Sequence, residues 1–489
     1  MRAGSIAVLL SALLVALQAC GVADAPESAT SEPSPIERSD PASSDTPPAP
    51  ADLDEWSYRL YDAGEPTSVW LPVTHPDDVL QNGFGYLTVD EHVVWLNYQH
   101  RERVEVLRPP ISLHVTSEEL CGAAGAEMRG WGAEPYAIEF HDEFDEVGLQ
   151  CLRGLSPRYI YARWADCDAL VDNDLLPTGL HGLTVAGCSD ASLRAIARLP
   201  HLEMLALGDP ITDARLAILA NAASLTWVSL HARRGVTTSL QGLSALNVRA
   251  LLLSGRREPT AEDIEAIASM PELRELSLAL SSVRMDQPHT AWRFPRRLER
   301  LELSRADPDT FAAACALPSL RSLSIDRAEG VEDIQCLGRQ SELETLRVMV
   351  PVSDADITAI GTLSRLRDLF IIVDERVDLG PLRNLRSLRA LRLAGQGVRS
   401  RDMETLAVLS GLRTLWLQDT RVTHLRSLVA LRQLHRLIMQ GRPPMRLGMS
   451  PSAVADLTRM RALREVSLPA LDEASRDRLR EARPEVLVW

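Results

Sequence analysis

Two clusters of carboxylates are dense enough in this sequence to suggest metal chemistry. They are HDEFDE at residues 141–146 and DCDALVDND at residues 166–174. Carboxylate oxygens are the ligands that Ca²⁺ prefers, so each cluster is a candidate calcium loop. Neither cluster has the D-x-D-x-D-G order of such a loop, however, and solvated acidic loops are far commoner. We therefore favour solvated loops and predict no metal site.

Catalytic motifs give no starting point for an enzyme. The sequence has no G-x-S-x-G, no H-E-x-x-H, no phosphate-binding loop and no G-x-G-x-x-G. Gly83-Phe84-Gly85 lacks the third glycine and the helix that would follow it. We therefore assign no catalytic residue and no cofactor, and we expect a protein that is not an enzyme.

The cysteines allow several interpretations. Apart from Cys20 they are Cys121, Cys151, Cys167, Cys188, Cys315 and Cys336. No C-x-x-C spacing suggests zinc. In an oxidising compartment a pairing among the first four would staple the N-terminal region, but six cysteines allow fifteen connectivities and we assign none. Cys315 and Cys336 are explained equally well as buried thiols.

Any site must be positioned by a short phrase that recurs along the chain. It reads LRDLFI from Leu366, LRALRL from Leu388 and LRTLWL from Leu412, at spacings of 22 and 24 residues. Aliphatic residues stand at its first, fourth and sixth positions, as in a short strand whose alternate side chains face a core. Further copies begin at Leu180, Leu202, Leu225, Val248, Leu273, Leu298, Leu320, Leu343, Leu434 and Leu463. No unit of this length buries its apolar face alone, so these thirteen copies predict a solenoid of stacked units.

This L-x-x-L-x-L pattern resembles the leucine-rich-repeat family, including its bacterial members. The resemblance implies an α/β solenoid with a curved parallel β-sheet on the concave face and helices and 3₁₀ turns on the convex face. One position departs from the family: where an Asn often hydrogen-bonds buried backbone, this chain has residues such as Cys188, Pro210 and Arg233. Other groups must satisfy that backbone here.

The convex segments are of two kinds. ITDARLAILANAAS and TAEDIEAIASMPE have a capping residue, early acids and helical apolar spacing, so we expect helices there, similar to the ribonuclease-inhibitor-like subtype. VEDIQCLGRQSE, VDLGPLRNLRS and VTHLRSLVALRQ have a shorter apolar period and predict 3₁₀ or irregular turns.

The strands present a candidate binding surface on their concave face. The third, fifth and seventh positions of the phrase should point away from the core, and in the C-terminal half they carry large side chains. These are Arg347, Met349, Phe370, Ile372, Arg392, Trp416, Arg436 and Ile438. Aromatic and Arg side chains on an open surface are typical of binding hot spots, although a terminal cap covering them is the alternative. We expect Phe370, Arg392 and Trp416 to form a row across adjacent strands.

The N-terminus predicts export. Arg2 precedes an apolar run from Ile6 to Leu17, too short to span a bilayer comfortably. It ends in Leu17-Gln18-Ala19-Cys20, which resembles the bacterial lipoprotein signal and implies acylation of Cys20. An ordinary secretory signal with an incidental cysteine is the alternative. Lipid would then be the membrane attachment, and which membrane carries it is left open.

We expect five segments along the chain. They are a lipoprotein signal peptide at 1–19, a Pro/Ser/acidic tether at 20–54, a β-rich cap at 55–110, degenerate entry repeats at 111–179 and leucine-rich repeats at 180–489. In the cap, VWLPV, YLTV and HVVWLNY predict short strands. Its aromatic residues could stack on sugars, although core packing is the commoner use.

The net charge differs between the two parts of the chain on either side of residue 360. From residue 360 onward it has 23 Arg and 14 acids, a net charge of +9, whereas the remainder has 29 basic and 53 acidic residues, a net charge of −24. We expect a non-enzymatic, lipid-anchored scaffold whose concave C-terminal half binds an envelope or extracellular protein. The alternative is a carbohydrate or cell-wall binder that acts through its cap. Nucleic acid is not an expected partner, because the chain is acidic and has no basic nucleic-acid-binding motif.

Overall fold

The computed structural model divides the chain into two compact units. They are Met1–Glu143 with Cys151–Tyr159, and Phe144–Gln150 with Ile160–Trp489. The residues that the structure describes are 149–153, 155–232, 240–255, 260–280, 292–328, 330–441, 452–468, 471–484 and 486–488, with Cys121 and six short strands before residue 141. The proposed signal peptide, Cys20 and the tether lie outside the described residues.

The first unit contains short paired strands. β1 (Ser57–Arg59) pairs antiparallel with β2 (Trp70–Pro72), and β3 (Leu87–Val89) pairs antiparallel with β4 (His92–Val94). β5 (Ser112–Val115) and β6 (Ala137–Phe140) pair in parallel, with Leu113 opposite Ile138. The strands expected in the cap are present. This parallel pair lies in the segment 111–179, where we expect degenerate entry repeats.

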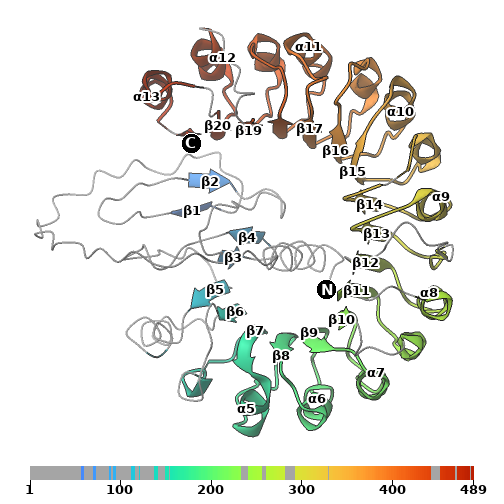
Figure 1. The fold of residues 1–489 in the computed structure, drawn as a ribbon. Helices are drawn as coiled ribbons and strands as arrows, with labels where there is room; N and C mark the ends of the chain where they lie inside the picture. Colours follow the sequence, from blue (N-terminus) through green and yellow to red (C-terminus); the bar gives the residue numbers. More distant parts are fainter. Residues whose placement is uncertain are drawn as a thin grey trace, which may run out of the picture. The chain divides into compact units, whose positions relative to one another are not determined.

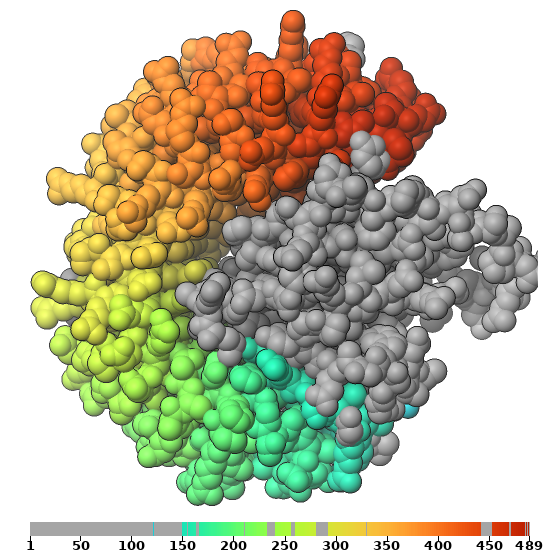
Figure 2. Space-filling view, turned by 180° about the vertical axis from the view of Figure 1, so that it is seen from behind, coloured from blue at the N-terminus to red at the C-terminus, as the bar shows by residue number. Residues whose placement is uncertain are grey.

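The second unit contains a parallel sheet of fourteen strands, β8 to β21, each paired with its neighbours in sequence order. The strands line the inner side of an arc and the helices lie on its outer side (Figure 1). Successive repeats follow one another in chain order along the arc (Figure 2).

The thirteen copies of the phrase account for thirteen of these strands, each starting two residues after its phrase begins. The last strand, β21, was not predicted. The strands are β8 (Gly182–Ala186), β9 (Met204–Pro210), β10 (Trp227–Ala232), β11 (Ala250–Gly255), β12 (Glu275–Leu280), β13 (Arg300–Leu303), β14 (Ser322–Ile325), β15 (Thr345–Pro351), β16 (Asp368–Ile372), β17 (Ala390–Ala394), β18 (Thr414–Gln418), β19 (Arg436–Gln440), β20 (Glu465–Ser467) and β21 (Leu487–Val488), preceded by β7 (Tyr159–Asp166).

The core is built from the aliphatic positions of the phrase. Leu388, Leu391 and Leu393 are at most 1% exposed. The register places Leu391 opposite Leu369 on one side and Leu415 on the other. Each aliphatic position therefore forms a continuous buried row, and no unit has a core of its own.

The convex elements begin at side-chain caps or are 3₁₀ turns. Thr212, Thr260 and Ser353 accept hydrogen bonds from the backbone N–H groups three residues later. The two predicted helices and the three predicted 3₁₀ turns are confirmed. The elements are α5 (Cys167–Asp172), α6 (Asp190–Ile196), α7 (Asp213–Leu219), η2 (Gln241–Ala245), α8 (Ala261–Ala268), α9 (Pro308–Cys315), η3 (Gln335–Arg339), α10 (Asp354–Ile360), η4 (Gly380–Asn384), η5 (Ser400–Asp402), α11 (Met403–Leu406), η6 (Arg426–Ala430), α12 (Ala453–Arg459) and α13 (Glu473–Ala482).

Two buried aspartates bond backbone groups of neighbouring repeats. Asp263 and Asp356, each 1% exposed, sit at the third helical position of α8 and α10. One carboxylate oxygen closes the capping box of its own helix. The other accepts a backbone N–H from the preceding repeat, Leu240 for Asp263 and Ile334 for Asp356, both at 2.8 Å. Each aspartate therefore joins two repeats as well as capping a helix.

Candidate binding surface

Four large side chains form a row across the concave face. The register places Arg347 of β15 opposite Phe370 of β16, Phe370 opposite Arg392 of β17, and Arg392 opposite Trp416 of β18. All four occupy the fifth position of their phrases. Adjacent strands lie about 4.8 Å apart, so the row spans roughly 14 Å. The register confirms the predicted row of Phe370, Arg392 and Trp416 and adds Arg347 at its start. We call these four residues the stacked row.

The side chains in the stacked row contact one another through their faces. The guanidinium carbon of Arg347 lies 5.4 Å from the centroid of the Phe370 ring, and that of Arg392 lies 5.2 Å from the same centroid. Arg392 also lies 3.6 Å from the centroid of the Trp416 ring. These distances fall within the range of cation–π attraction. Cations and rings therefore alternate along the row.

Phe370 requires a correction. Its place in the phrase predicts an open surface, but the residue is only 5% exposed. An arginine on each side lies near its ring, and long arginine side chains cover apolar surface while they keep their charged ends outward. Phe370 thus supports its neighbours, whereas Arg392 and Trp416 are partly exposed.

The electrostatics of the stacked row centre on Arg392. Burial, together with the positive charge of Arg347, lowers the pKa of Arg392 to about 10, against a smaller opposing effect of Asp368. Arg392 stays charged at neutral pH, so the row carries a poorly hydrated cation. Arg347 differs, because its Nε lies 3.9 Å from a carboxylate oxygen of Asp326.

The other predicted surface residues are less uniform. Arg436 of β19 forms an ion pair with the buried Glu465 of β20, so that cation already has a partner within the chain. Ile438 lies opposite Trp416 and extends the stacked row by one strand. The register shifts between Val348 and Pro351, which leaves Met349 outside a regular row with Ile372. Five of the eight residues predicted for the surface therefore lie in one row of fifth positions. Met349, Ile372 and Arg436 lie outside this row.

Sequence reasoning missed an acidic part of the same surface. Glu302 of β13 occupies the fifth position, and its carboxylate accepts a hydrogen bond from Ser277 Oγ at 3.3 Å. Burial, and next the negative charge of Asp326, raise the pKa of Glu302, although Arg347 acts in the opposite direction. The sequence did contain a signal for this residue, because Glu302 is the fifth residue of the phrase that begins at Leu298.

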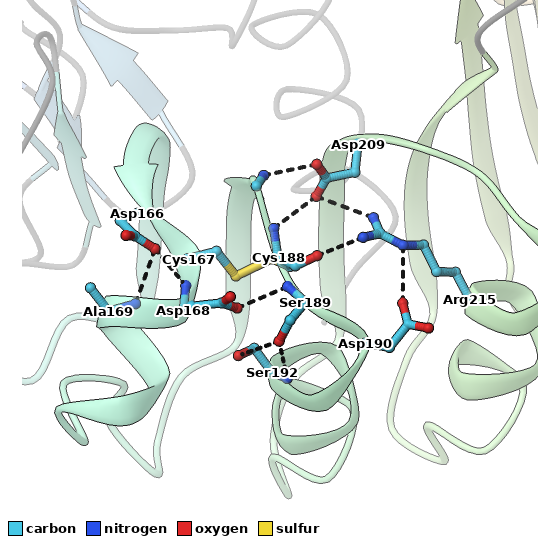
Figure 3. The surroundings of a disulfide bond; sticks show 11 residues. Asp166, Cys167, Asp168, Ala169, Cys188, Ser189, Asp190, Ser192, Asp209 and Arg215 are labelled. Carbon is cyan, nitrogen blue, oxygen red and sulfur yellow. Dashed lines mark hydrogen bonds and ion pairs between the residues drawn. A yellow bond between two sulfur atoms is a disulfide. The ribbon is translucent and has the colours of Figure 1, made fainter. Parts of the chain in front are cut away.

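The acidic cluster at residues 166–174 has a structural use. Asp166 accepts the backbone N–H groups of Asp168 and Ala169 at the start of α5, and Asp168 accepts that of Ser189 at 2.8 Å (Figure 3). Hydrogen bonds from the Ser192 side chain and the Ser189 backbone lower the pKa of Asp168. Among the described residues no group of His, Cys, Asp or Glu has the arrangement of a metal site. The cluster at 141–146 lies outside them.

The same region shows how the first full repeats are joined. Asp209 accepts the backbone N–H groups of Gly187 at 2.8 Å and Cys188 at 3.1 Å. Arg215 pairs with Asp209 and Asp190, both at 3.3 Å, and donates to the carbonyl oxygen of Cys188 (Figure 3). A charged network thus satisfies backbone groups where the family often has Asn.

All six cysteines that follow Cys20 form disulfides. The pairs are Cys121–Cys151, Cys167–Cys188 and Cys315–Cys336. The last two each span 21 residues, one repeat, and so join adjacent units of the solenoid. The interpretation of Cys315 and Cys336 as buried thiols is therefore wrong.

Comparisons with known proteins find no family and give structural likenesses at low identity. No protein-family model matches this sequence, and no curated protein matches it. A solved internalin (inlF) of Listeria monocytogenes is 19% identical over 67% of this chain and 86% of that chain, with a TM-score of 0.36. A leucine-rich-repeat protein of Leptospira interrogans is 14% identical over 64% of this chain and 90% of that chain, with a TM-score of 0.35.

A third solved structure, the functional domain of InlJ from Listeria monocytogenes, includes a cysteine ladder. It is 14% identical over 56% of this chain and 63% of that chain, with a TM-score of 0.33. The repeated phrase, the parallel sheet and the convex helices and 3₁₀ turns of the present chain define a leucine-rich-repeat solenoid. In the part of the chain that the structure describes, no helix is both long and apolar enough to cross a bilayer.

Proposed function

We propose that this protein is a non-enzymatic, protein-binding scaffold of the bacterial cell envelope, anchored by lipid on Cys20. Its partner binds the concave face of the C-terminal repeats. The observation that carries this proposal is the stacked row, in which two arginines and two aromatic rings alternate on adjacent strands. In this proposal the chain is a bacterial leucine-rich-repeat protein with ribonuclease-inhibitor-like helices in some of its repeats.

The chemistry of the stacked row favours a protein partner. Arg and Trp dominate binding hot spots because they bury a large area and also make directional contacts. Their rotamers are restrained by mutual stacking, so a partner loses little side-chain entropy on binding them. The C-terminal repeats are also the basic part of an otherwise acidic chain, and a local field of one sign steers an oppositely charged partner.

The proposed location in the cell envelope is inferred from the sequence of the N-terminus. Arg2, the apolar run and Ala19-Cys20 predict an exported precursor whose mature N-terminus is an acylated cysteine. Three disulfides suit an oxidising, extracytoplasmic compartment. Replacing Cys20 with Ala should release the protein from the membrane fraction. If mass spectrometry of the wild-type protein finds no lipid on Cys20, the proposed lipid anchor is wrong.

A carbohydrate or cell-wall ligand bound through the aromatic cap at residues 55–110 is the second candidate. Trp and Tyr residues in that segment could stack on sugar rings. In that case the repeats are structural, and changes in the stacked row leave binding intact.

One experiment separates the two candidates. Purified wild-type protein and a Trp416→Ala variant are used to capture partners from envelope extract, with glycan and peptidoglycan binding measured in parallel. We expect a protein partner whose affinity falls by about 1–3 kcal/mol in the variant. Thr184→Ala, at the same phrase position in an early repeat, is the control. Binding to glycan that persists in the Trp416 variant, without a captured protein, would favour the second candidate.

A further inference from the structure

Arg392 differs from the three other arginines that occupy the third or fifth position of a phrase. Arg300 pairs with Glu275 at 3.5 Å, Arg347 pairs with Asp326 at 3.9 Å, and Arg436 pairs with Glu465. Arg392 has no hydrogen bond and no ion pair to any residue that the structure describes, and its contacts are the rings of Phe370 and Trp416. Asp368 acts on it only as a nearby charge. The row thus holds one cation without a matching anion.

Its neighbour Trp416 has an unused donor. The indole Nε1 is buried and, within the described repeats, has no hydrogen-bond partner. A buried N–H without an acceptor is costly. Two donors on adjacent strands, one charged and one neutral, therefore lack an acceptor.

Apolar and basic groups surround this pair of donors. Ile438 lies opposite Trp416 on β19, and its side chain is partly exposed. Arg413 precedes Trp416 by three residues in the same phrase and, like Arg392, has no carboxylate partner in the described part of the chain. A ligand at this point therefore meets the Arg392 cation beside an apolar side chain.

We propose that the surface formed by Arg392, Trp416 and Ile438 receives an aspartate or glutamate side chain from an extended, acidic segment of the partner protein, with an apolar residue of that segment against Ile438. This inference rests on the proposed function and names the chemistry of its partner. A carboxylate matches the planar guanidinium of Arg392 in a bidentate pair. A partly desolvated site makes such a pair specific, because a neutral amide in its place leaves the cation unpaired.

The test begins with an unbiased probe. The full chain is used to select binders from a phage library of random 12-residue peptides, in parallel with Arg392→Met and Arg347→Met variants. We expect peptides selected by the wild-type protein to contain Asp or Glu next to an apolar residue. Arg392→Met should lose this preference, whereas Arg347→Met should keep it. Thermal unfolding of both variants establishes that they fold.

The second step measures the charge directly. A selected peptide and its counterpart with Gln in place of Glu are labelled, and their binding is followed by fluorescence anisotropy. We expect about tenfold weaker binding of the Gln peptide to the wild-type protein, with little difference between the peptides on Arg392→Met. If Arg392→Met does not fold, Arg392→Lys serves instead and should retain part of the preference.

Three outcomes would overturn the inference. The first is selection of peptides without acids, or of no peptide at all. The second is equal binding of the Glu and Gln peptides. The third is tighter binding of polyphosphate or dextran sulfate than of any acidic peptide, lost in Arg392→Met, which would assign the surface to a phosphate or sulfate polymer.

The proposed function can survive such a failure. If an envelope protein is captured in a Trp416-dependent way but binds Arg392→Met normally, the scaffold function stands and the carboxylate inference falls. If no captured protein depends on Trp416, the proposed function itself fails.

Discussion

The guanidinium carbon of Arg392 lies 3.6 Å from the centroid of the Trp416 ring, on the neighbouring strand. A partly desolvated cation–π pair of this kind is worth about 0.5–2 kcal/mol. Trp416→Ala and Arg392→Met should therefore each reduce the free energy of unfolding by an amount in this range. A double-mutant cycle in denaturant should give a favourable coupling energy between them. A coupling energy of zero would mean that the stacking adds no stability.

The core register predicts that substitutions at Leu391, on β17, and at Arg389, just before β17, differ greatly in their effect on stability. Leu391 is 1% exposed, so Leu391→Asp buries a charge without a partner and should cost several kcal/mol of stability. Arg389 is exposed, and its guanidinium donates to the Gly411 carbonyl at 3.1 Å. Arg389→Ala should cost about 1 kcal/mol or less. If the two variants unfold at the same concentration of guanidinium chloride, this register is wrong.

Asp356 should be one of the most sensitive polar residues in the solenoid. Its carboxylate accepts from the backbone N–H groups of Ile334 and Ser353 and from the Ser353 hydroxyl. Asp356→Ala leaves buried donors without acceptors and should cost about 2–4 kcal/mol in a denaturant titration. Asp333→Ala is the matched control, since Asp333 is exposed and, among the described residues, accepts only from the Gln335 backbone N–H. Equal losses in the two variants would contradict the inter-repeat role of Asp356.

The Cys315–Cys336 bond joins adjacent repeats across 21 residues of sequence. Closing a loop of this size stabilises a protein by about 3 kcal/mol through the entropy of the unfolded chain. The double variant Cys315→Ala/Cys336→Ala should lose stability of that order. Alkylation of the unreduced, unfolded protein followed by mass spectrometry checks the pairing directly. Modification of Cys315 or Cys336 before reduction would show that the bond does not form.

Glu302 should make stability depend on pH. Burial raises its folded-state pKa above the value of 4.5 that it has when unperturbed. Between these two values the folded protein binds more protons than the unfolded chain, so the contribution of Glu302 to stability falls as pH rises through the window and then becomes constant. Glu302→Gln removes this dependence. Its stability relative to wild type should therefore be higher at pH 7 than at pH 4 in denaturant titrations.

An unchanged difference between Glu302→Gln and wild type at the two pH values would indicate that Arg347 and Ser277 compensate fully for the burial of Glu302. Ser324→Ala, at the next fifth position along the row, is a control without a titratable group.

The sequence by itself determined the repeating part of this protein. Aliphatic residues at the first, fourth and sixth positions of each phrase specify which side of a strand is buried, because side chains alternate along a strand. That is why the strands from β8 to β20 begin where the phrase predicts. The capping residues Thr212 and Thr260 located helices for the same local reason. The stacked row could also be predicted, because its four residues occupy the same position of successive phrases.

Only the tertiary structure decided which side chains meet. The pairing of Cys315 with Cys336 depends on how two convex segments of unequal length are brought together, which spacing alone does not give. The enclosure of Phe370 depends on the rotamers of long side chains on neighbouring strands, and so does the lack, among the described residues, of an ion pair to Arg392. Such contacts are set by packing between repeats, whereas a repeat pattern specifies only the face on which a side chain lies.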